Sequence, residues 1–195
     1  MRAIDAELEA GVGVAAFNRM YLAVTTAVHA RVVAGGFRDP RFLGRLTAVF
    51  AELYLDAYAR AGATPPACPQ AWEPLFEARR RPRIAGVQYA WAGMNAHITY
   101  DLGVAVVDAC GQLGLRPRTG SAQHADYLAM NRVLEESAEG VKTELLSDLL
   151  HVAGAALGRV DDIVSMWSIA RARDAAWSHA EALAVLDGFA PVRDG

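Results

Sequence analysis

The sequence predicts an all-α protein, built as a single-domain bundle of five to six helices around a buried central helix. Apolar residues recur three and four positions apart, and Ala, Leu, Arg and Glu, which favour helices, dominate the chain. No β-branched run alternates with polar residues between Asn-Gly or Asp-Gly turns, so strand signals are lacking. The breaks between the periodic segments are short, which is typical of antiparallel neighbours in a bundle.

The first two long helices have clear ends in the sequence. The first is predicted over residues 14–34, and the glycine pair that follows should end it, since glycine accepts the left-handed conformation of a helix C-terminus. The second is predicted over residues 40–61. Asp39 can cap its first turn, Pro40 suits the first helical position, and Gly62 follows its last residue.

The remaining segments are separated by breaks rich in proline and glycine. A Pro-rich loop precedes a short helix, and Pro82 separates this helix from a long apolar one. Ser121 is a suitable cap for the helix after the next break. The four helices are predicted over residues 71–78, 84–113, 122–150, with a bend near Gly140, and 159–188.

Length and charge limit the class of protein. The 195 residues fit one domain, residues 1–195, which is long enough to bury a core without disulfides or a structural metal. With 53% hydrophobic and 21% charged residues, disorder is excluded. A net charge of −3 argues against a nucleic-acid partner, which needs a clustered basic face. The one basic run, residues 78–83, is interpreted as a solvated connection, with phosphate or partner binding as the alternative.

The expected compartment is the cytoplasm. Cys68 and Cys110 have no CxxC partner, which suits a reducing environment. The acidic start MRAIDAELEAG lacks the basic and apolar regions of a secretory signal. The longest uncharged run, residues 84–100, contains polar side chains and is predicted to be a buried helix rather than a membrane span. No membrane partner is therefore expected.

The stretch GMNAHITYDL places polar side chains in the most apolar helix. A helix turns about 100° per residue, so His97 and Asp101 share one face, while Gln88 and Asn95 share another. The helix is otherwise apolar nearly all round and therefore belongs in the middle of the bundle. Three of its glycines, Gly86, Gly93 and Gly103, should let neighbouring backbones approach closely.

A buried carboxylate in this helix needs partners, because an unpaired buried polar group costs about 1–3 kcal/mol and a charge costs more. His97, four residues earlier, is the nearest candidate partner for Asp101. One interpretation is structural: the two side chains orient each other, and Asn95 and Gln88 connect helices. The other is functional: His97 acts as a base or metal ligand, and Asp101 orients it or is a second ligand.

Further acidic residues extend this pair into a candidate metal site. Asp161 and Asp162 fall in the first turn of the last predicted helix, where they either interact with the helix dipole or complete the site. A ferritin-like di-iron centre is disfavoured, because no glutamate has a histidine three residues after it. The candidate cofactor is a divalent metal, and its candidate ligands are His97, Asp101, Asp161, Asp162 and Glu52.

A helical family of uncharacterised proteins, common in actinobacteria and classed as a domain of unknown function, resembles this chain in four segments. They are FNRMYLAVT, AWEPLFEAR, AGMNAHITYDL and GRVDDIVSMWSIARARDAAW. The resemblance runs from about Gly13 to Leu186, and G-M-N-A-H-I is its most specific part. It implies an all-helical fold and no established reaction. It also implies that relatives continue past the position of Gly195. A chain that stops there is then expected to expose an apolar surface, on which a homodimer would form.

Two functional hypotheses follow. In the first, the protein is an enzyme that acts on a small, largely apolar molecule in a pocket between helices, with His97 and Asp101 as catalytic residues. The substrate-binding candidates are Gln88, Asn95, Arg171 and Asn18. In the second, the chain is a non-catalytic ligand-binding or homodimeric interaction module, and the same side chains form a structural polar core. A solvent-reachable pocket lined by His97 favours the enzyme, and a dry, fully paired network favours the module.

Overall fold

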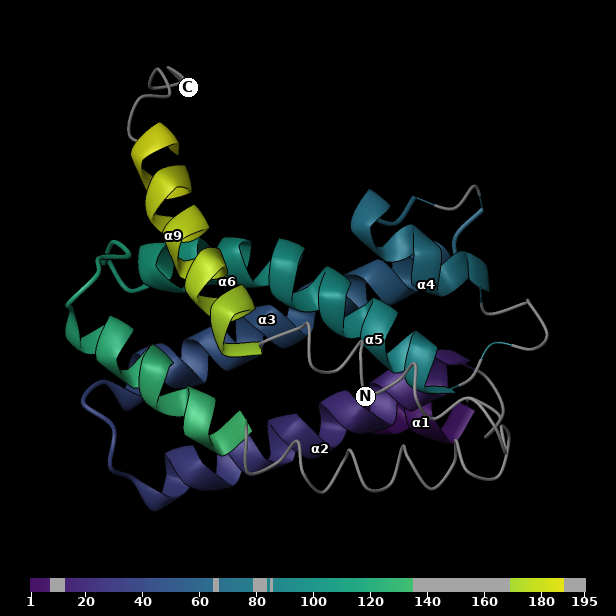
Figure 1. Ribbon diagram of the computed structural model, residues 1–195, viewed down its shortest axis with the longest axis horizontal. Helices are drawn as coiled ribbons and strands as arrows, with labels where there is room; N and C mark the ends of the chain where they lie inside the picture. Colours follow the sequence, from purple (N-terminus) through teal and green to yellow (C-terminus); the bar gives the residue numbers. More distant parts are fainter. Residues whose placement is uncertain (8–12, 65–66, 79–83, 85, 135–168, 188–195) are drawn as a thin grey trace.

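The structure, a computed structural model, describes residues 1–7, 13–64, 67–78, 84, 86–134 and 169–187 (Figure 1). Every regular element in these ranges is a helix and none is a strand, which confirms the predicted all-α class. The basic run after Ala78 and the start of the last predicted helix, with Asp161 and Asp162, lie outside the described residues. No helix in the described ranges is both long and apolar enough to cross a membrane.

The observed helices follow the predicted order. α2 (Gly13–Ala34) and α3 (Pro40–Ala61) begin and end within a residue of their predicted bounds, whereas α1 (Arg2–Glu7) was not predicted. The predicted central helix consists of three consecutive segments: α5 (Gly86–Ala96), η2 (His97–Asp101) and α6 (Leu102–Gln112). The remaining helical elements are η1 (Gln70–Trp72), α4 (Glu73–Ala78), residues 122–134 and α9 (Ile169–Asp187).

The ends of α2 and α3 form as their sequences predict. Gly35 and Gly36 have φ angles of +84° and +95°, so they end α2 in the left-handed region. The side chain of Asp39 accepts a hydrogen bond of 3.0 Å from the backbone N–H of Phe42, and Pro40 opens α3. This backbone hydrogen bond is the main reason why the pKa of the Asp39 carboxyl lies below its usual value.

The α5–η2–α6 segment forms the centre of the bundle, as predicted. α2 packs along α5, while α3 and α9 pack against α6, which α9 crosses at a steep angle (Figure 1). One core cluster joins α2, α4, α5 and the second half of α3. A second cluster joins the first half of α3 with α6, α9 and the 122–134 helix. Phe50 and Met94 pack against both clusters and connect them.

Close helix contacts depend on two glycines of the central helix. A Cβ atom on Gly93 would lie 2.5 Å from the ring of Phe17 in α2. A Cβ atom on Gly103 would lie 3.2 Å from the carbonyl oxygen of Ala176 in α9. A larger residue at either position would push the neighbouring helix outward. The predicted role of these two glycines in close approach is thereby confirmed.

Gly93→Ala should lower the free energy of unfolding by about 1–3 kcal/mol, because the added methyl group overpacks the contact with Phe17. Gly44→Ala is the matched control, since Gly44 is exposed in α3 and no heavy atom lies within 4 Å of its Cβ position. Alanine favours a helix over glycine, so the control should gain up to about 1 kcal/mol. Urea denaturation followed by circular dichroism measures both changes. Equal stability of the two variants would contradict the packing role of Gly93.

Candidate functional site

The central helix contains one irregular turn, at the polar stretch GMNAHITYDL. η2 is π-helical: the backbone N–H of Leu102 donates to the carbonyl of His97, five residues earlier. Such turns are rare, occur mostly as single bulges within α-helices, and are frequent at functional sites. This turn buries the side chains of His97, Ile98 and Asp101. The polar pair identified from the sequence therefore lies inside the bundle.

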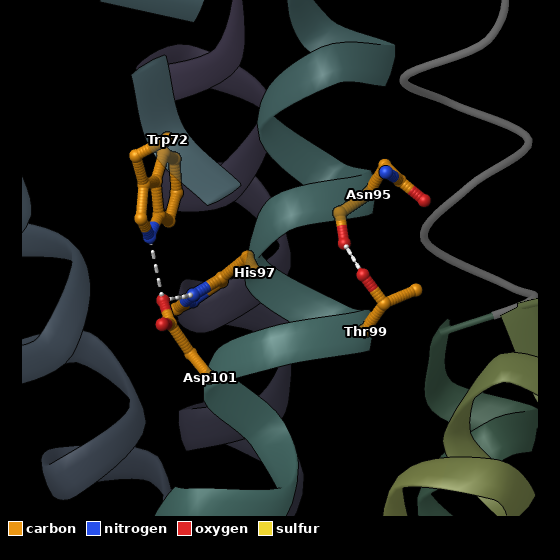
Figure 2. A network of polar contacts seen from close by, with 5 residues as sticks. All are labelled: Trp72, Asn95, His97, Thr99 and Asp101. Carbon is orange, nitrogen blue, oxygen red and sulfur yellow. Dashed lines mark hydrogen bonds and ion pairs between the residues drawn. The ribbon is translucent and has the colours of Figure 1, made fainter. Parts of the chain in front are cut away.

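His97, Asp101 and Trp72 form a buried hydrogen-bonded network (Figure 2). Nδ1 of His97 lies 2.9 Å from Oδ2 of Asp101, so the predicted pairing is present. Trp72, which comes from η1, donates its Nε1–H to the same oxygen at 3.0 Å. The side chains of His97 and Asp101 are each 3% exposed, so protein donors take the place of water around the carboxylate. Trp72 is a partner that the sequence did not indicate.

The imidazole of His97 lies within a shell of aromatic rings. Phe50 stacks on it, with ring centroids 3.5 Å apart and an angle of 4° between the planes. Tyr21 meets it edge-on at 4.5 Å. The other three rings of this shell, at 5.6 to 6.2 Å, are those of Trp72, Phe17 and Tyr54. Nε2 of His97 is buried and has no hydrogen-bond partner among the described residues.

The imidazole of His97 is neutral at pH 7. Burial lowers the pKa of His97 below its usual value of about 6.5, and this outweighs the opposing effect of Asp101. Because Asp101 accepts the hydrogen bond at Nδ1, the proton of the neutral ring is on Nδ1. Nε2 is then a lone-pair acceptor among aromatic rings. Native structures contain few such unsatisfied atoms, and each one calls for an explanation.

Three predicted substrate-binding residues do not converge on His97. Gln88, Asn95 and Arg171 are exposed. Figure 2 shows Asn95 on the side of the helix that faces away from His97, where its backbone carbonyl accepts the hydroxyl of Thr99. The structure therefore separates these side chains from the buried pair.

The fourth predicted substrate-binding residue, Asn18, is fully buried in a different contact. Its Nδ2 donates to the backbone carbonyl of Met1 at 3.1 Å. Its Oδ1 accepts from the hydroxyl of Tyr54 at 3.4 Å. Asn18 thus ties the start of the chain to α2 and supports one ring of the aromatic shell.

The predicted metal-ligand set is only partly assembled by the described residues. His97 and Asp101 lie together, but Glu52 is exposed on α3. Asp161 and Asp162 lie outside the described ranges. Within those ranges, no three His, Cys, Asp or Glu side chains are grouped so that they could hold a metal ion.

A second buried polar cluster, not predicted as a site, centres on Arg173 of α9. Its guanidinium lies over the ring of Tyr127, 4.2 Å from the centroid. Its Nε donates to Oδ1 of Asn131 at 2.6 Å, and its Nη2 donates to the carbonyl of Tyr127 at 2.9 Å. The hydroxyl of Tyr127 donates in turn to the carbonyl of Arg173 at 2.7 Å. These contacts fix α9 to the 122–134 helix.

A small pocket lies beside the aromatic shell, where α2, α3, α6, the 122–134 helix and α9 meet. Its volume is about 60 Å³. Tyr21 and Phe50 belong both to its lining and to the shell around His97, whereas His97 itself does not line it. Arg173 lines it from α9, and most of the other lining residues are Val, Leu and Met. The pocket thus separates the two buried polar clusters.

Asp101→Asn should lower the free energy of unfolding by about 3 kcal/mol, because two buried donors lose a charged acceptor. Asp56→Asn is the matched control. Asp56 also forms an ion pair four residues apart, with Arg60 at 2.8 Å, but these side chains are 51% and 56% exposed. Asp56→Asn should therefore lower the free energy of unfolding by less than about 1 kcal/mol. Urea denaturation compares the variants, and similar losses would contradict a stabilising role for the buried network.

The neutral state of His97 predicts a loss of stability in mild acid. Below about pH 6.5 the unfolded chain binds a proton at His97 that the folded chain does not, so stability falls with pH until the lowered folded pKa is reached. The free energy of unfolding should drop by up to about 2 kcal/mol from pH 7.5 to pH 5.

His97→Gln should flatten this pH dependence in urea denaturation. The lowered pKa of Asp39 changes the stability only below about pH 4, so it does not contribute to the change measured between pH 7.5 and pH 5. If the wild type became more stable toward pH 5, the imidazolium form would be the buried one, contrary to this assignment.

Comparisons with curated proteins and with solved structures give no significant match. The profile of one protein family, described as a family of unknown function (DUF5995), matches residues 1–194. The match spans nearly the whole chain, and it agrees with the resemblance to a domain of unknown function seen in the sequence. The chain therefore belongs to DUF5995, a family of unknown function.

Proposed function

We propose that this protein binds a small, largely apolar molecule in the pocket between α2, α3, α6, the 122–134 helix and α9. The observation that carries the proposal is the convergence of side chains from these five helices on one hollow that is open on one side. Ligand pockets are concave and mainly apolar, and a few polar groups orient the ligand. The lining of this pocket has that composition.

The size of the pocket limits what it encloses. An apolar cavity of about 150 Å³ accommodates benzene. The hollow here has about 60 Å³, so it takes only a few non-hydrogen atoms, and the rest of a larger ligand extends from its open side. Val24, Leu46 and Met130 supply apolar surface. Each methylene group buried there contributes about 0.8 kcal/mol to binding.

The network of His97, Asp101 and Trp72 positions two of the aromatic rings that line this pocket. His97 stacks on Phe50 and meets the edge of Tyr21, and both of these rings line the pocket. Because Asp101 holds the imidazole in one orientation, the two lining rings are held as well. In this proposal the buried polar residues are structural, as in the ligand-binding module considered from the sequence.

An enzyme with His97 as general base is the second candidate. The unpartnered Nε2 favours it, because a neutral imidazole oriented through Nδ1 is suited to accept a proton. Phe50 lines the pocket and stacks on His97, so a substrate would have to displace its ring to reach Nε2. The nitrogen NMR shift of Nε2 separates the two candidates. A large change on ligand binding favours the enzyme, and an unchanged shift favours the module.

Val24→Phe should abolish binding of hexanol, a neutral probe, because the larger side chain fills the pocket. Amide NMR spectra of the wild type should show saturable shifts at pocket residues such as Thr47 and Leu102. Val33→Phe is the matched control on α2, since Val33 is 73% exposed, and it should bind like the wild type. The proposal fails if the wild type shows no saturable shifts, or if Val24→Phe binds as well as the control.

A further inference from the structure

One side of α3 is turned away from the core along most of the helix. Its buried residues cluster on the other side, since a helix turns about 100° per residue, and they are Phe42, Leu43, Leu46, Val49, Tyr54, Ala57 and Ala61. The side chains opposite them are exposed or half-buried. They form the outer face of α3, which consists of Arg41, Gly44, Arg45, Ala48, Ala51, Glu52, Leu55 and Asp56.

Small and apolar residues form a seam along this outer face. Gly44, Ala48, Ala51 and Leu55 follow one another at spacings of four, three and four residues, so they lie on one line along the helix. Leu55 is 37% exposed, which is unusual for a large apolar side chain. In the part of the chain that the structure describes, no heavy atom lies within 4 Å of a Cβ position on Gly44. The seam thus leaves room for a second helix to approach closely.

Four exposed charged residues lie along one flank of this seam, with the two signs separated. Arg41 and Arg45 are in the first half of α3, whereas Glu52 and Asp56 are in the second half. The four positions fall within about 60° of the helix circumference. The helix dipole does not account for their order, because it favours anions near the N-terminus and cations near the C-terminus.

One antiparallel register pairs all four charges with those of an identical helix. Across a two-fold axis, residue i of one copy contacts residue j of the other, and j contacts i. Arg41 and Asp56 are symmetric about a point between residues 48 and 49, and Arg45 and Glu52 are symmetric about the same point. A single axis at this point therefore forms both pairs and repeats each of them. In the same register, Leu55 falls close to Gly44 of the second copy.

The contacts that these charges already make leave them available. Nε of Arg45 donates to the side-chain oxygen of Gln112, a neutral acceptor. Asp56 accepts from Nε of Arg60 at 2.8 Å, and these two side chains are 51% and 56% exposed. Exposed ion pairs contribute little to stability, and a carboxylate can accept from more than one donor. Asp56 can therefore keep its own Arg60 and also accept from a second copy.

We propose that the outer face of α3 binds a second copy of this chain as an antiparallel helix pair, with the two-fold axis beside Ala48. Charge complementarity identifies the occupant, because one face supplies both signs in the order that its own reverse requires. A parallel pair would instead bring like charges together. The proposed ligand pocket is lined by Leu43, Leu46 and Phe50 from the other side of α3, so the helix pair is independent of the proposed function.

Analytical ultracentrifugation of the full chain tests the pairing. A single helix pair is a small interface, so the wild type should dimerise weakly, with a dissociation constant of about 10–100 µM in about 20 mM NaCl. Raising the salt to about 500 mM should weaken the dimer about tenfold, because exposed ion pairs are screened. A wild type that stays monomeric at a protein concentration of about 0.5 mM in low salt overturns the proposal.

Two charge-reversed variants test the register. Arg41→Glu/Arg45→Glu makes this flank wholly acidic, and Glu52→Arg/Asp56→Arg makes it wholly basic. Each variant alone should dimerise at least about tenfold more weakly than the wild type, since like charges then meet. An equal mixture of the two should form a heterodimer at least as tight as the wild-type dimer, because every pair again has opposite signs.

A control variant and a seam variant complete the set, with the helical content of all variants checked by circular dichroism. Arg2→Glu/Arg132→Glu is the matched control, because it reverses two exposed arginines outside α3, and it should dimerise like the wild type. Gly44→Gln places a long side chain where the described chain leaves open space. It should therefore keep the monomer fold and weaken the dimer about tenfold, since it displaces Leu55 of the second copy.

The outcomes of these experiments decide the proposal. If both charge-reversed variants dimerise as well as the control, the dimer uses another face and the proposal is overturned. If each is monomeric but their mixture forms no heterodimer, the antiparallel register is wrong. The charge-reversed variants should bind hexanol like the wild type. A failure of the helix pair therefore leaves the proposed function standing, and a lack of hexanol binding leaves the helix pair standing.

Discussion

The buried carboxylate of Asp101 is the constraint around which the centre of the bundle is organised. A carboxylate is removed from water at tolerable cost only where donors replace the water. His97 and Trp72 supply two N–H groups to one of its oxygens. Trp72 belongs to the connection between α3 and α5, so its hydrogen bond sets where that connection lies on the central helix. Apolar packing alone would tolerate several arrangements there, whereas a directional bond selects one.

The two buried polar clusters differ in what they leave unsatisfied. Around Asp101 the donors are used, and the remaining atom is the acceptor Nε2 of His97. Around Arg173 the acceptors among the described residues are neutral, and they are the amide oxygen of Asn131 and the backbone carbonyl of Tyr127. Fully satisfied networks stiffen a core, whereas an incomplete one beside a hollow is suited to a ligand. Tyr21 and Phe50 line the pocket and contact the ring of His97, so in the proposed function the ligand would contact two rings of the shell around His97.

Much of the fold could be predicted from the sequence, because the signals are short-range. Apolar spacing of three and four residues indicated the helices, and local capping by Asp39 and Pro40 indicated where α3 begins. Because the segment α5–η2–α6 is apolar along nearly its whole length, it was predicted to lie in the middle of the bundle. The pairing of His97 with Asp101 is also local, since one helical turn separates them. Each inference needs only residues within about one turn or one helix.

The partners and the pocket were decided by tertiary structure. Trp72 lies 29 residues from Asp101, and Tyr127 lies 46 residues from Arg173, so no periodicity in one helix relates them. Packing of α9 against the 122–134 helix gives Arg173 its aromatic partner, Tyr127. The sequence by itself determined where the long helices α2 and α3 form and that His97 and Asp101 share a face of the central helix. Only packing decided which face is covered and by what, because burial depends on neighbours that are distant along the chain.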